Sequence, residues 1–573
     1  MILGIDLGTT NSAAAYMTAE GPRLIANALG EPLTPSVVGI DQQGDLLVGR
    51  AAKDWQVTHP ERCAAAFKRQ MGNSWTTSLA GREFTPEKLS SLVLAALKQD
   101  AEAFFGQPID EAVITVPAYF NEHQRKATLE AGKIAGLRVD RILNEPTAAA
   151  IAYGFHESRE EKVLVVVDLG GGTFDVSVVE MFEGTVEVRA SSGDSFLGGE
   201  DFTATLAARV LESQGYLYER VEFESPLLVA RMRHLCERAK CRLSFEEQVQ
   251  LRIPTRQGEV PENAPEVTVT RQQFEAWTEH ILRRIDLPVR RALADANVAP
   301  EKVNEVILVG GATRMPSFVA RLRERFGKEP QHRINPDEVV ALGAAVQAGL
   351  IGKSAALDEL VVTDVAPFTL GVETCKEFGG DYRTGYMLPI IHRNTTIPVS
   401  RVKRVSTVEP NQTQVRVRVF QGENRRVEHN VLLGEFCVDR VPKGPAGQEV
   451  DIRFTYDLNG VLEVEATVVE TKRKVTHLIT RHTRGMSQAQ IAQAVAEMQG
   501  MKTPPREEAM YRALLKRAER VFEELPLQAK EYLGSLLDGF EEAMELGDRE
   551  SIERHRKAVE EFLDGHDLEA EEP

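Results

Sequence analysis

The hydrophobic positions follow one pattern twice along the chain: an apolar strand enters a glycine-containing turn, and a second apolar strand leaves it. Residues 163–180 read Val-Leu-Val-Val-Val-Asp-Leu-Gly-Gly-Gly-Thr-Phe-Asp-Val-Ser-Val-Val-Glu, which predicts strand, tight turn and strand. Residues 2–16 repeat this order around Asp-Leu-Gly-Thr-Thr-Asn. Such an internal repeat predicts two similar lobes, each of which offers one hairpin to a shared cleft.

The turns of both hairpins carry residue types that suit a phosphate group. Consecutive glycines let the backbone approach a bulky ligand, and their N–H groups can point at one anion. Asp168 and Asp175 flank the second turn, and Asp6 precedes the first. Carboxylates beside a phosphate are explained if Mg²⁺ lies between them. One hairpin alone is equally well explained as an ordinary glycine-rich turn with solvated aspartates, but the second copy favours a polyphosphate site.

The remaining pattern divides the chain into regions. Helix and strand patterns alternate through the first part, and a third glycine turn follows the apolar run 306–309. Short alternating strands come next, and an apolar stripe at helical spacing marks the last part. We therefore expect a multidomain α/β + β protein with an α/β domain at 1–353, a linker at 354–366, a β-sandwich at 367–484, and helices with an acidic tail at 485–573.

Length and charge restrict the classes of function. The 573 residues are too many for one hydrophobic core, and 42% hydrophobic with 27% charged residues is typical of a globular protein. A net charge of −18 argues against nucleic acid or an anionic membrane surface as the main partner. The five cysteines are scattered, without a Cys-x-x-Cys pair. We therefore expect a reduced, cytoplasmic protein with neither a signal peptide nor a membrane span.

Three features each have two interpretations at this point. Glu145 stands at a helix start and is either a cap or a catalytic carboxylate, with the cap favoured. Glu237, Lys240 and Ser244 share one helix face, and such a polar face is usually only the solvated side. Residues 360–362, Leu-Val-Val, are either a linker segment that docks in at least one state or a plain strand of the next domain.

Eight motifs in a fixed order give the chain a specific resemblance. They stand at 5–12, 116–121, 144–150, 168–175, 197–202, 309–316, 393–398 and 421–424. Together they resemble the seventy-kilodalton heat-shock chaperones, the DnaK family, and especially its compact bacterial members. The resemblance implies an actin-like two-lobed ATPase domain, a β-sandwich peptide-binding domain and a short C-terminal helical lid. It also implies an ATP-dependent chaperone, in which slow hydrolysis of ATP to ADP switches the affinity for extended apolar segments of unfolded polypeptides.

The resemblance further implies roles for single residues around ATP, ADP and Mg²⁺. Asp6 and Asp168 would hold Mg²⁺ through water. The catalytic residues would be Lys68, Glu145, Thr173 and Asp175. The nucleotide would be bound by Asp6, Gly8, Thr9, Thr10, Asn11, Asp168, Gly170, Gly171, Gly172, Thr173, Gly198, Gly199, Glu237, Lys240, Ser244, Gly310, Gly311, Arg314 and Asp337. For Glu145 and for the polar helix face, the resemblance therefore favours the functional interpretation.

Peptide binding and its coupling to the nucleotide complete the implied roles. Pro117 and Arg125 would relay the nucleotide state to the linker residues Leu360, Val361 and Val362. The peptide groove would be formed by Val372, Cys375, Tyr386, Val405, Val408, Val415 and Val417. Cys375 and Val408 replace the residue pair that commonly arches over the peptide in the family, which leaves the peptide preference open. A J-domain co-chaperone is the implied partner, a monomer is expected, and the need for a nucleotide-exchange factor stays open.

Two other functions of actin-like proteins compete with the chaperone. A small-molecule kinase, such as a sugar kinase, or a filament-forming ATPase would explain the paired hairpins. Neither would need a peptide-binding sandwich and a lid. The part of the chain after residue 354 therefore favours the chaperone.

Overall fold

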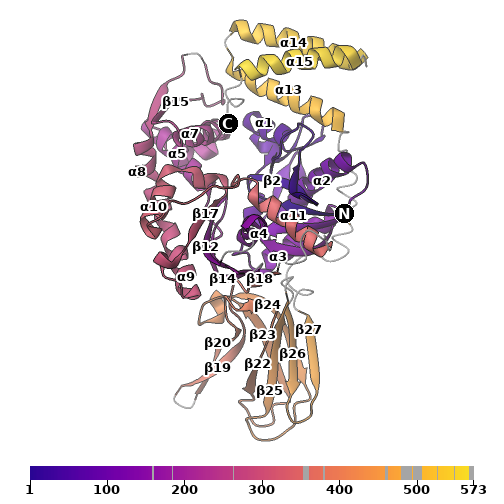
Figure 1. The fold of residues 1–573 in the computed structure, drawn as a ribbon, viewed down its shortest axis with the longest axis vertical. Helices are drawn as coiled ribbons and strands as arrows, with labels where there is room; N and C mark the ends of the chain where they lie inside the picture. The colour runs from indigo at the N-terminus through magenta and orange to yellow at the C-terminus, as the bar shows by residue number, and fades with distance from the viewer. Residues whose placement is uncertain are drawn as a thin grey trace.

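The structure, a computed structural model, has one region of helices and mixed sheets between a β-sandwich and a group of C-terminal helices (Figure 1). The residues it describes are 1–157, 161–182, 185–261, 263–352, 361–378, 381–457, 462–478, 493, 506–525, 527–546 and 549–566. Leu360, the predicted boundaries at 353–354 and 484–485, and the predicted acidic tail lie outside the described residues.

The N-terminal sheet is built around the first predicted hairpin. Its strand order is β11-β10-β1-β2-β3, with β4 paired to β2, and β1 is parallel to β10 but antiparallel to β2. The strands are β1 (Ile2–Asp6), β2 (Asn11–Thr18), β3 (Gly21–Ile25), β4 (Thr34–Pro35), β10 (Glu111–Val116) and β11 (Arg138–Asn144). The helices of this region are α1 (Arg50–Thr58), α2 (Pro86–Phe105), α3 (Glu122–Ile134) and α4 (Glu145–Glu157). Smaller sheets contain β5 (Val38–Ile40), β6 (Leu46–Val48), β7 (Cys63–Ala64), β8 (Thr77–Leu79) and β9 (Arg82–Phe84).

Local sequence signals explain where the helices of this region begin and end. Thr85 caps α2 by accepting a hydrogen bond from the Lys88 backbone N–H, and a proline occupies the first turn. The same helix ends at Gly106, whose φ of 66° lies in the left-handed region. Asn121 forms a capping box with Gln124 at the start of α3. The predicted helix starts near residues 121 and 145 are therefore present.

The second sheet repeats the topology of the first. Its order is β17-β12-β13-β14-β18-β21, and β12 is parallel to β17 and antiparallel to β13, as β1 is to β10 and β2. The strands are β12 (Lys162–Leu169), β13 (Phe174–Phe182), β14 (Thr185–Asp194), β17 (Glu305–Val309), β18 (Val361–Val365) and β21 (Thr396–Ile397). The other elements of the region are α5 (Gly199–Ser213), α6 (Tyr218–Glu224), α7 (Pro226–Leu243), β15 (Gln248–Arg252), β16 (Glu266–Thr270), α8 (Arg271–Leu282), α9 (Asp286–Ala296), α10 (Pro316–Phe326) and α11 (Val339–Ile351). The sequence repeat is thus a repeat of backbone topology.

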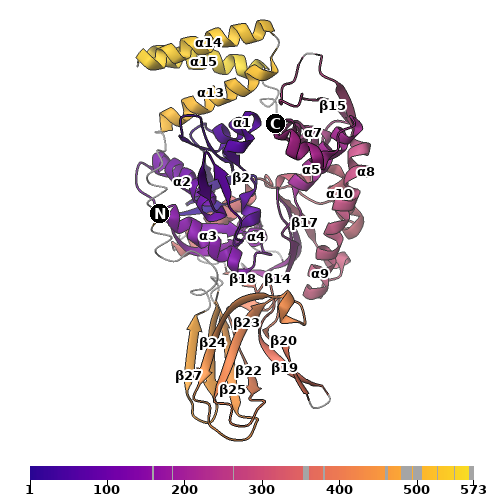
Figure 2. The ribbon, with the colours of Figure 1, turned by 180° about the vertical axis from the view of Figure 1, so that it is seen from behind.

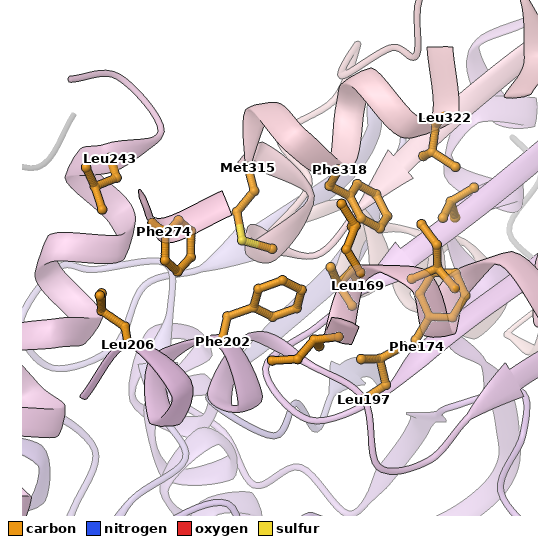
Figure 3. Packing of buried hydrophobic residues seen from close by; sticks show 14 of the residues in the cluster. Leu169, Phe174, Leu197, Phe202, Leu206, Leu243, Phe274, Met315, Phe318 and Leu322 are labelled. Atoms are coloured by element: carbon orange, nitrogen blue, oxygen red, sulfur yellow. The ribbon is translucent and has the colours of Figure 1, made fainter. Parts of the chain in front are cut away.

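Aromatic side chains fill the space between the second sheet and its helices. Phe174 of β13, Phe202 of α5, Phe274 of α8 and Phe318 of α10 belong to one buried cluster, and Met315 lies among them (Figure 3). Burying a side chain of this size contributes about 1.5–3 kcal/mol. This packing holds the end of β12, and hence the glycine turn that follows it, in a fixed position.

Two alanine-rich helices, α4 and α11, lie between the two sheets (Figures 1 and 2). Gly343 of α11 lies against Ala148 of α4, and Gly4 of β1 lies against Ala344 of α11. A Cβ atom on either glycine would collide with the facing backbone. Small residues therefore permit this close packing, which sets the separation of the two hairpins.

A β-sandwich follows the second sheet. Its two sheets have the orders β20-β19-β23-β24 and β22-β25-β26-β27. The strands are β19 (Leu370–Phe378), β20 (Asp381–Ile391), β22 (Val399–Ser406), β23 (Gln414–Gln421), β24 (Val431–Asp439), β25 (Glu449–Tyr456), β26 (Leu462–Val468) and β27 (Lys474–Leu478). Buried and more exposed residues alternate along β25 and β26, so each sheet presents one apolar face to a shared core.

Polar contacts hold the sandwich against both sheets. Glu122 at the start of α3 donates its backbone N–H to Gln421 at 3.0 Å and accepts a hydrogen bond from the Tyr456 hydroxyl at 2.5 Å. On the other side, Arg393 pairs with Asp295 of α9 at 2.9 Å. The described part of the predicted linker is not an open tether, because β18 is hydrogen-bonded to β14 in the second sheet and to β21 from the sandwich region.

Three helices, α13 (Arg506–Glu524), α14 (Leu527–Leu546) and α15 (Arg549–His566), lie at the opposite end of the molecule from the sandwich (Figure 2). Their apolar stripes share a core, as the helical spacing predicts. α13 also packs on α1. Arg520 pairs with Asp54 at 2.9 Å, both side chains being 1% exposed, and Lys516 lies 3.9 Å from the centre of the Trp55 ring. None of the described helices is long and apolar enough to cross a membrane.

The Arg520–Asp54 pair predicts which contact holds α13 on α1. Arg520→Met leaves Asp54 as a buried carboxylate without this partner, which costs about 3–5 kcal/mol. We expect α13 to detach from α1 in this variant while the helical core survives, since Val521, Leu533 and Phe540 are untouched. Hydrogen exchange of α1 and α13 backbone amides measures the detachment.

The matched control is Arg517→Met, which removes an arginine of the same helix from a more exposed pair with Asp564 at 3.0 Å. A pair of this kind contributes less than about 1 kcal/mol, so exchange in α1 should stay as in the wild type. Equal protection in both variants would show that the buried pair does not hold the helix.

Candidate functional site

The turns of the two predicted hairpins lie directly against each other. A Cβ atom on Gly171 would overlap the Thr10 side chain, and one on Gly172 would collide with Thr9 and Arg69. The turns can approach this closely only because these positions are glycine. The structure thus brings the first and second hairpins together, although more than 150 residues separate them in the sequence.

Backbone hydrogen bonds fix the second turn. Gly170 donates its N–H to the Thr173 carbonyl at 3.1 Å, and its own carbonyl accepts from the Gly199 N–H at 2.9 Å. Gly198 packs on Gly171 so tightly that a Cβ atom would collide with its backbone. The start of α5 therefore supports the glycine turn from behind.

Hydroxyl groups fix the first turn. The Gly8 N–H donates to the Ser12 hydroxyl at 3.1 Å, and the Ser36 hydroxyl donates to the Gly8 carbonyl at 2.8 Å. The Thr10 carbonyl accepts from the Ser36 N–H at 2.8 Å. Asn11 begins β2, and its carbonyl occupies the space next to Gly8 that a Cβ atom would need.

Four carboxylates and one lysine lie next to the turns. Lys68, in a 3₁₀ turn at Phe67–Gln70, is 3% exposed, and its Nζ lies 2.6 Å from an oxygen of Glu145. Asp6 accepts a hydrogen bond from the Thr115 hydroxyl at 2.9 Å. Asp175 accepts one from the Tyr119 backbone N–H at 2.9 Å. Asp168 is the cross-strand partner of Asp175 in the β12–β13 ladder.

Burial and mutual repulsion perturb these carboxyl groups. Burial, followed by the nearby charge of Glu145, raises the pKa of Asp6 to about 7 and that of Asp175 to about 8. The same two causes, with Asp175 third, raise the pKa of Asp168 well above its ordinary value. The charge of Lys68 lowers the pKa of each of these three aspartates. When all four carboxyl groups are ionised, their negative charge therefore exceeds the positive charge of Lys68.

This excess charge fits a bound divalent cation that keeps its water. Among the described residues, no group of three or more His, Cys, Asp or Glu side chains is arranged to ligate a metal directly. Mg²⁺ is usually held by one or two carboxylates, several waters and the substrate phosphates. Asp6 and Asp168 are suited to that arrangement, and the bound ion would neutralise charge on the phosphates.

A second group of predicted residues lies on α7 and on the third glycine turn. Lys240 is buried, pairs with Glu237 at 2.7 Å and donates to the Gly199 carbonyl at 3.1 Å. The solvated-face interpretation is therefore wrong for Lys240. Glu237 also accepts from Thr203, and Ser244 lies at the end of the same helix.

The third glycine turn lies beside the end of β12. Gly310 has a φ of +81° and packs against the Leu169 carbonyl, where a side chain would collide. Gly311 faces Asp337, and Asp337 pairs with Arg314 at 2.9 Å. The structure therefore places the predicted nucleoside residues on two elements, α7 and this turn, that flank the second hairpin.

Arg125 lies in a polar connection that leads to β18. Its guanidinium donates to Asn144 at 2.6 Å and to the Phe120 carbonyl at 3.1 Å. The Asn144 amide donates in turn to Asp364 of β18 at 2.9 Å. Pro117 accepts from the Phe120 N–H at 3.1 Å and lies at the end of β10. Buried side chains thus connect Arg125 to the predicted linker.

The predicted linker residues differ in their environment. Val361 is 55% exposed, although it is the cross-strand neighbour of Thr185. Val362 is paired with Val186 and packs against the cluster between the sheets. The described part of this segment therefore forms a strand beside β14, with Val362 packed against the cluster and Val361 largely exposed.

The seven predicted peptide-binding positions are divided between the two sheets of the sandwich. Val405 belongs to β22 and Val408 follows it, while the other five lie on β19, β20 and β23 of the facing sheet. Val372 and Val417 are buried in the sandwich core, and Cys375 and Tyr386 are half-buried. The structure does not bring these positions together on one open surface.

Sequence reasoning missed three residues that organise the site. Arg69 donates to the Gly172 carbonyl at 2.9 Å and pairs with Asp201, so it ties the glycine turn to α5. Tyr119 contributes its backbone N–H to Asp175. Asp364 is buried between Asn144 and Thr147. A charged residue inside the apolar run 361–365 was a usable signal for the last; the first two depend on tertiary contacts.

Comparison with known proteins shows which family the chain belongs to. The family model described as "Hsp70 protein" matches residues 2–80 and 75–572. The chain belongs to the Hsp70 family. Three curated relatives are each named "Chaperone protein DnaK", from Thermotoga petrophila, Thermotoga maritima and a further Thermotoga strain. Each is 41% identical over 489 residues, which are 84% of this chain and 80% of the relative.

Membership of the Hsp70 family establishes the general function. The protein is an ATP-dependent chaperone and an ATPase, and it uses ATP and ADP with Mg²⁺. An ATPase domain and a β-sandwich substrate domain are confirmed as its coarse architecture. It binds unfolded polypeptides and J-domain co-chaperones, as DnaK-like chaperones do. The kinase and filament alternatives are not favoured.

The raised carboxyl pKa values predict how stability depends on pH without nucleotide and Mg²⁺. The pKa of Asp175 is about 8 in the folded protein against 3.8 for the ordinary group, so the folded protein holds a proton that the unfolded chain has released. Stability is therefore lost as pH rises from about 4 to about 8. We expect Asp175→Asn, which cannot ionise, to flatten the fall of Tm across this range.

The control for this measurement is Asp110→Asn, because Asp110 has a 79% exposed side chain. Its Tm should change with pH as the wild-type Tm does. An Asp175→Asn protein whose Tm falls as steeply as that of the wild type would contradict the assigned cause.

Proposed function

We propose that Lys68, Glu145, Thr173 and Asp175 carry out ATP hydrolysis between the two hairpins. The buried Lys68–Glu145 pair at 2.6 Å is the observation that carries the proposal. Phosphoryl transfer to water depends on positioning and charge neutralisation more than on a covalent group. Lys68 would neutralise phosphate charge, and the carboxylates of Glu145 and Asp175 would orient the attacking water.

The other predicted site residues would bind the nucleotide. Thr9, Thr10 and Gly171 meet from two hairpins, and backbone N–H groups in such turns suit phosphates. Asp6 and Asp168 would hold hydrated Mg²⁺ beside them. The Glu237–Lys240 face of α7 and the turn at 310–314 would hold the nucleoside. The close contact between glycine turns and threonines supports this arrangement.

We further infer that residues 1–353 form an actin-like ATPase domain whose two lobes are built on the two large sheets. Residues 354–366 would link this domain to the sandwich. β18 adds to the edge of the second sheet, and Asp364 connects it to Arg125 through Asn144. A nucleotide-dependent shift of the lobes would change how β18 pairs with β14. Peptide binding would then reciprocally alter nucleotide handling. Pro117 would belong to the same relay because it ends β10.

The sandwich at 367–484 and the helices of 485–573 would form the peptide-binding domain and its lid. The predicted groove positions Val372 and Val417 are buried in the present arrangement, with α13 held on α1 far from the sandwich. This arrangement suits the state in which the linker is docked and the peptide is released. We propose that the protein acts as a cytoplasmic monomer, with or without a nucleotide-exchange factor.

Replacement of Lys68 tests the catalytic assignment. Lys68→Met should lower the rate of ATP hydrolysis by about 100-fold or more, because it removes preorganised charge from the transition state. ATP binding, measured by calorimetry, should persist. Single-turnover hydrolysis of bound ATP is the measurement.

Lys98→Met is the matched control, since it removes a lysine with a 17% exposed side chain from a pair with Glu102 at 2.8 Å. It should hydrolyse ATP at close to the wild-type rate. Near-normal turnover in a folded Lys68→Met protein would refute the assigned role.

Substitutions at two neighbouring valines distinguish docking of the linker from a general effect of added negative charge. Val362→Asp places a carboxylate against the cluster between the sheets, whereas Val361→Asp places it at the more exposed position. We expect the first to abolish stimulation of ATP hydrolysis by an extended apolar peptide and the second to reduce it much less. Steady-state ATPase rates with and without peptide give the answer, and equal coupling in both variants would exclude a docked β18.

A further inference from the structure

Positive charge is concentrated around one tyrosine of β20, and it comes from β19 and from the segment that follows β23. Lys376 Nζ lies 5.3 Å from the centre of the Tyr386 ring, and the guanidinium carbons of Arg425 and Arg426 lie 5.4 Å and 4.6 Å from it. Each distance is within the range in which a cation is attracted to an aromatic face. Tyr386 is one of the residues assigned to the peptide groove.

The cluster is built by backbone contacts and does not depend on flexible side chains alone. Tyr386 forms an isolated antiparallel bridge with Arg426. The Met387 N–H donates to the Arg425 carbonyl at 3.0 Å. Met387 and Val427 are buried together next to this bridge. The segment that carries the two arginines is therefore held beside β20.

Charge pairing within the hairpin is unfavourable. Lys376 lies directly opposite Arg383 in the β19–β20 ladder, and like charges at directly opposite positions are destabilising. Lys376 and Arg425 are both exposed, and neither forms an ion pair with any residue in the described part of the chain. Glu377 follows Lys376 on β19, and Glu428 stands two residues after Arg426.

Glu428 only partly compensates the cluster. It lies 3.7 Å from Arg426 and is also 3.7 Å from His429. The wider domain is positive as well: residues 367–484 contain 18 Lys and Arg but 14 Asp and Glu, whereas the whole chain has a net charge of −18. Positive charge is therefore concentrated on the domain that receives the peptide.

We propose that this cluster selects clients in which acidic residues flank the extended apolar segment. The proposal rests on the proposed peptide-binding role of the sandwich and names the class of substrate for it. The apolar residues of a client would occupy the groove, and flanking Asp or Glu carboxylates would bind Lys376 and Arg425. Clients with basic flanks would be repelled by Lys376 and Arg425 and would bind more weakly.

The test uses the full-length protein with ADP and three labelled peptides that share one apolar Leu-Leu-Val-Leu core. The core is flanked on both sides by pairs of Asp, Ser or Lys, and fluorescence anisotropy gives each Kd. We expect the acidic peptide to bind about three- to tenfold tighter than the serine peptide, as two or three exposed charge pairs allow. The lysine peptide should bind most weakly, and the differences should shrink as salt is added.

The double variant Lys376→Gln/Arg425→Gln should bind all three peptides with nearly equal Kd while retaining the affinity for the serine peptide. Lys472→Asn is the control, because it removes an exposed positive charge from the β26–β27 turn at a residue with φ of 58°, where asparagine is tolerated. It should preserve the acidic preference.

Two failures are distinguishable. If the serine peptide binds but the acidic one binds no better, the charge selection is wrong and the peptide-binding role stands. If none of the peptides binds under any nucleotide condition, the assignment of the sandwich as the peptide domain falls, and the selection falls with it.

Discussion

The site depends on one buried cation among four carboxylates. Lys68 has almost no contact with water and pairs with Glu145, while burial and the nearby charge of Glu145 raise the pKa of Asp6, Asp168 and Asp175. Removing charges from water is costly, and their attraction repays that cost only in part. Ionised carboxylates around a single lysine suit a hydrated divalent cation, because Mg²⁺ is commonly held by one or two carboxylates and several waters.

The surrounding fold keeps these groups in place. Two sheets of the same topology are packed through α4 and α11, whose alanines and glycines allow close approach. Aromatic residues behind β12 and β13 hold the second turn, and hydroxyl groups of Ser12 and Ser36 hold the first. A rigid frame suits a slow hydrolysis that must respond to a distant event, because packed interfaces change between discrete states rather than deforming gradually.

Buried polar groups connect the region near the carboxylates to β18 and to the sandwich. Arg125, Asn144 and Asp364 form a connected series that ends on β18, and Asp364 has a pKa raised by burial. Glu122, at the start of the helix that carries Arg125, contacts Tyr456 and Gln421 of the sandwich. Two sets of buried polar contacts therefore lead towards β18 and the sandwich, and breaking either would leave a buried polar group without its partner.

The sequence alone determined the repeated hairpins, the helix starts near residues 121 and 145, the alternating strands of the sandwich and the helical C-terminal region, because each depends on local periodicity, capping and turn chemistry. It also supplied the residue types from which a phosphate site is proposed. Only the tertiary structure decided that Glu145 pairs with Lys68, that Arg69 ties the glycine turn to α5, that Asp364 is buried against Asn144, and that Arg520 docks on Asp54. Each of these contacts joins residues far apart in the chain, and the energy of a buried charge is set by its surroundings rather than by its sequence neighbours.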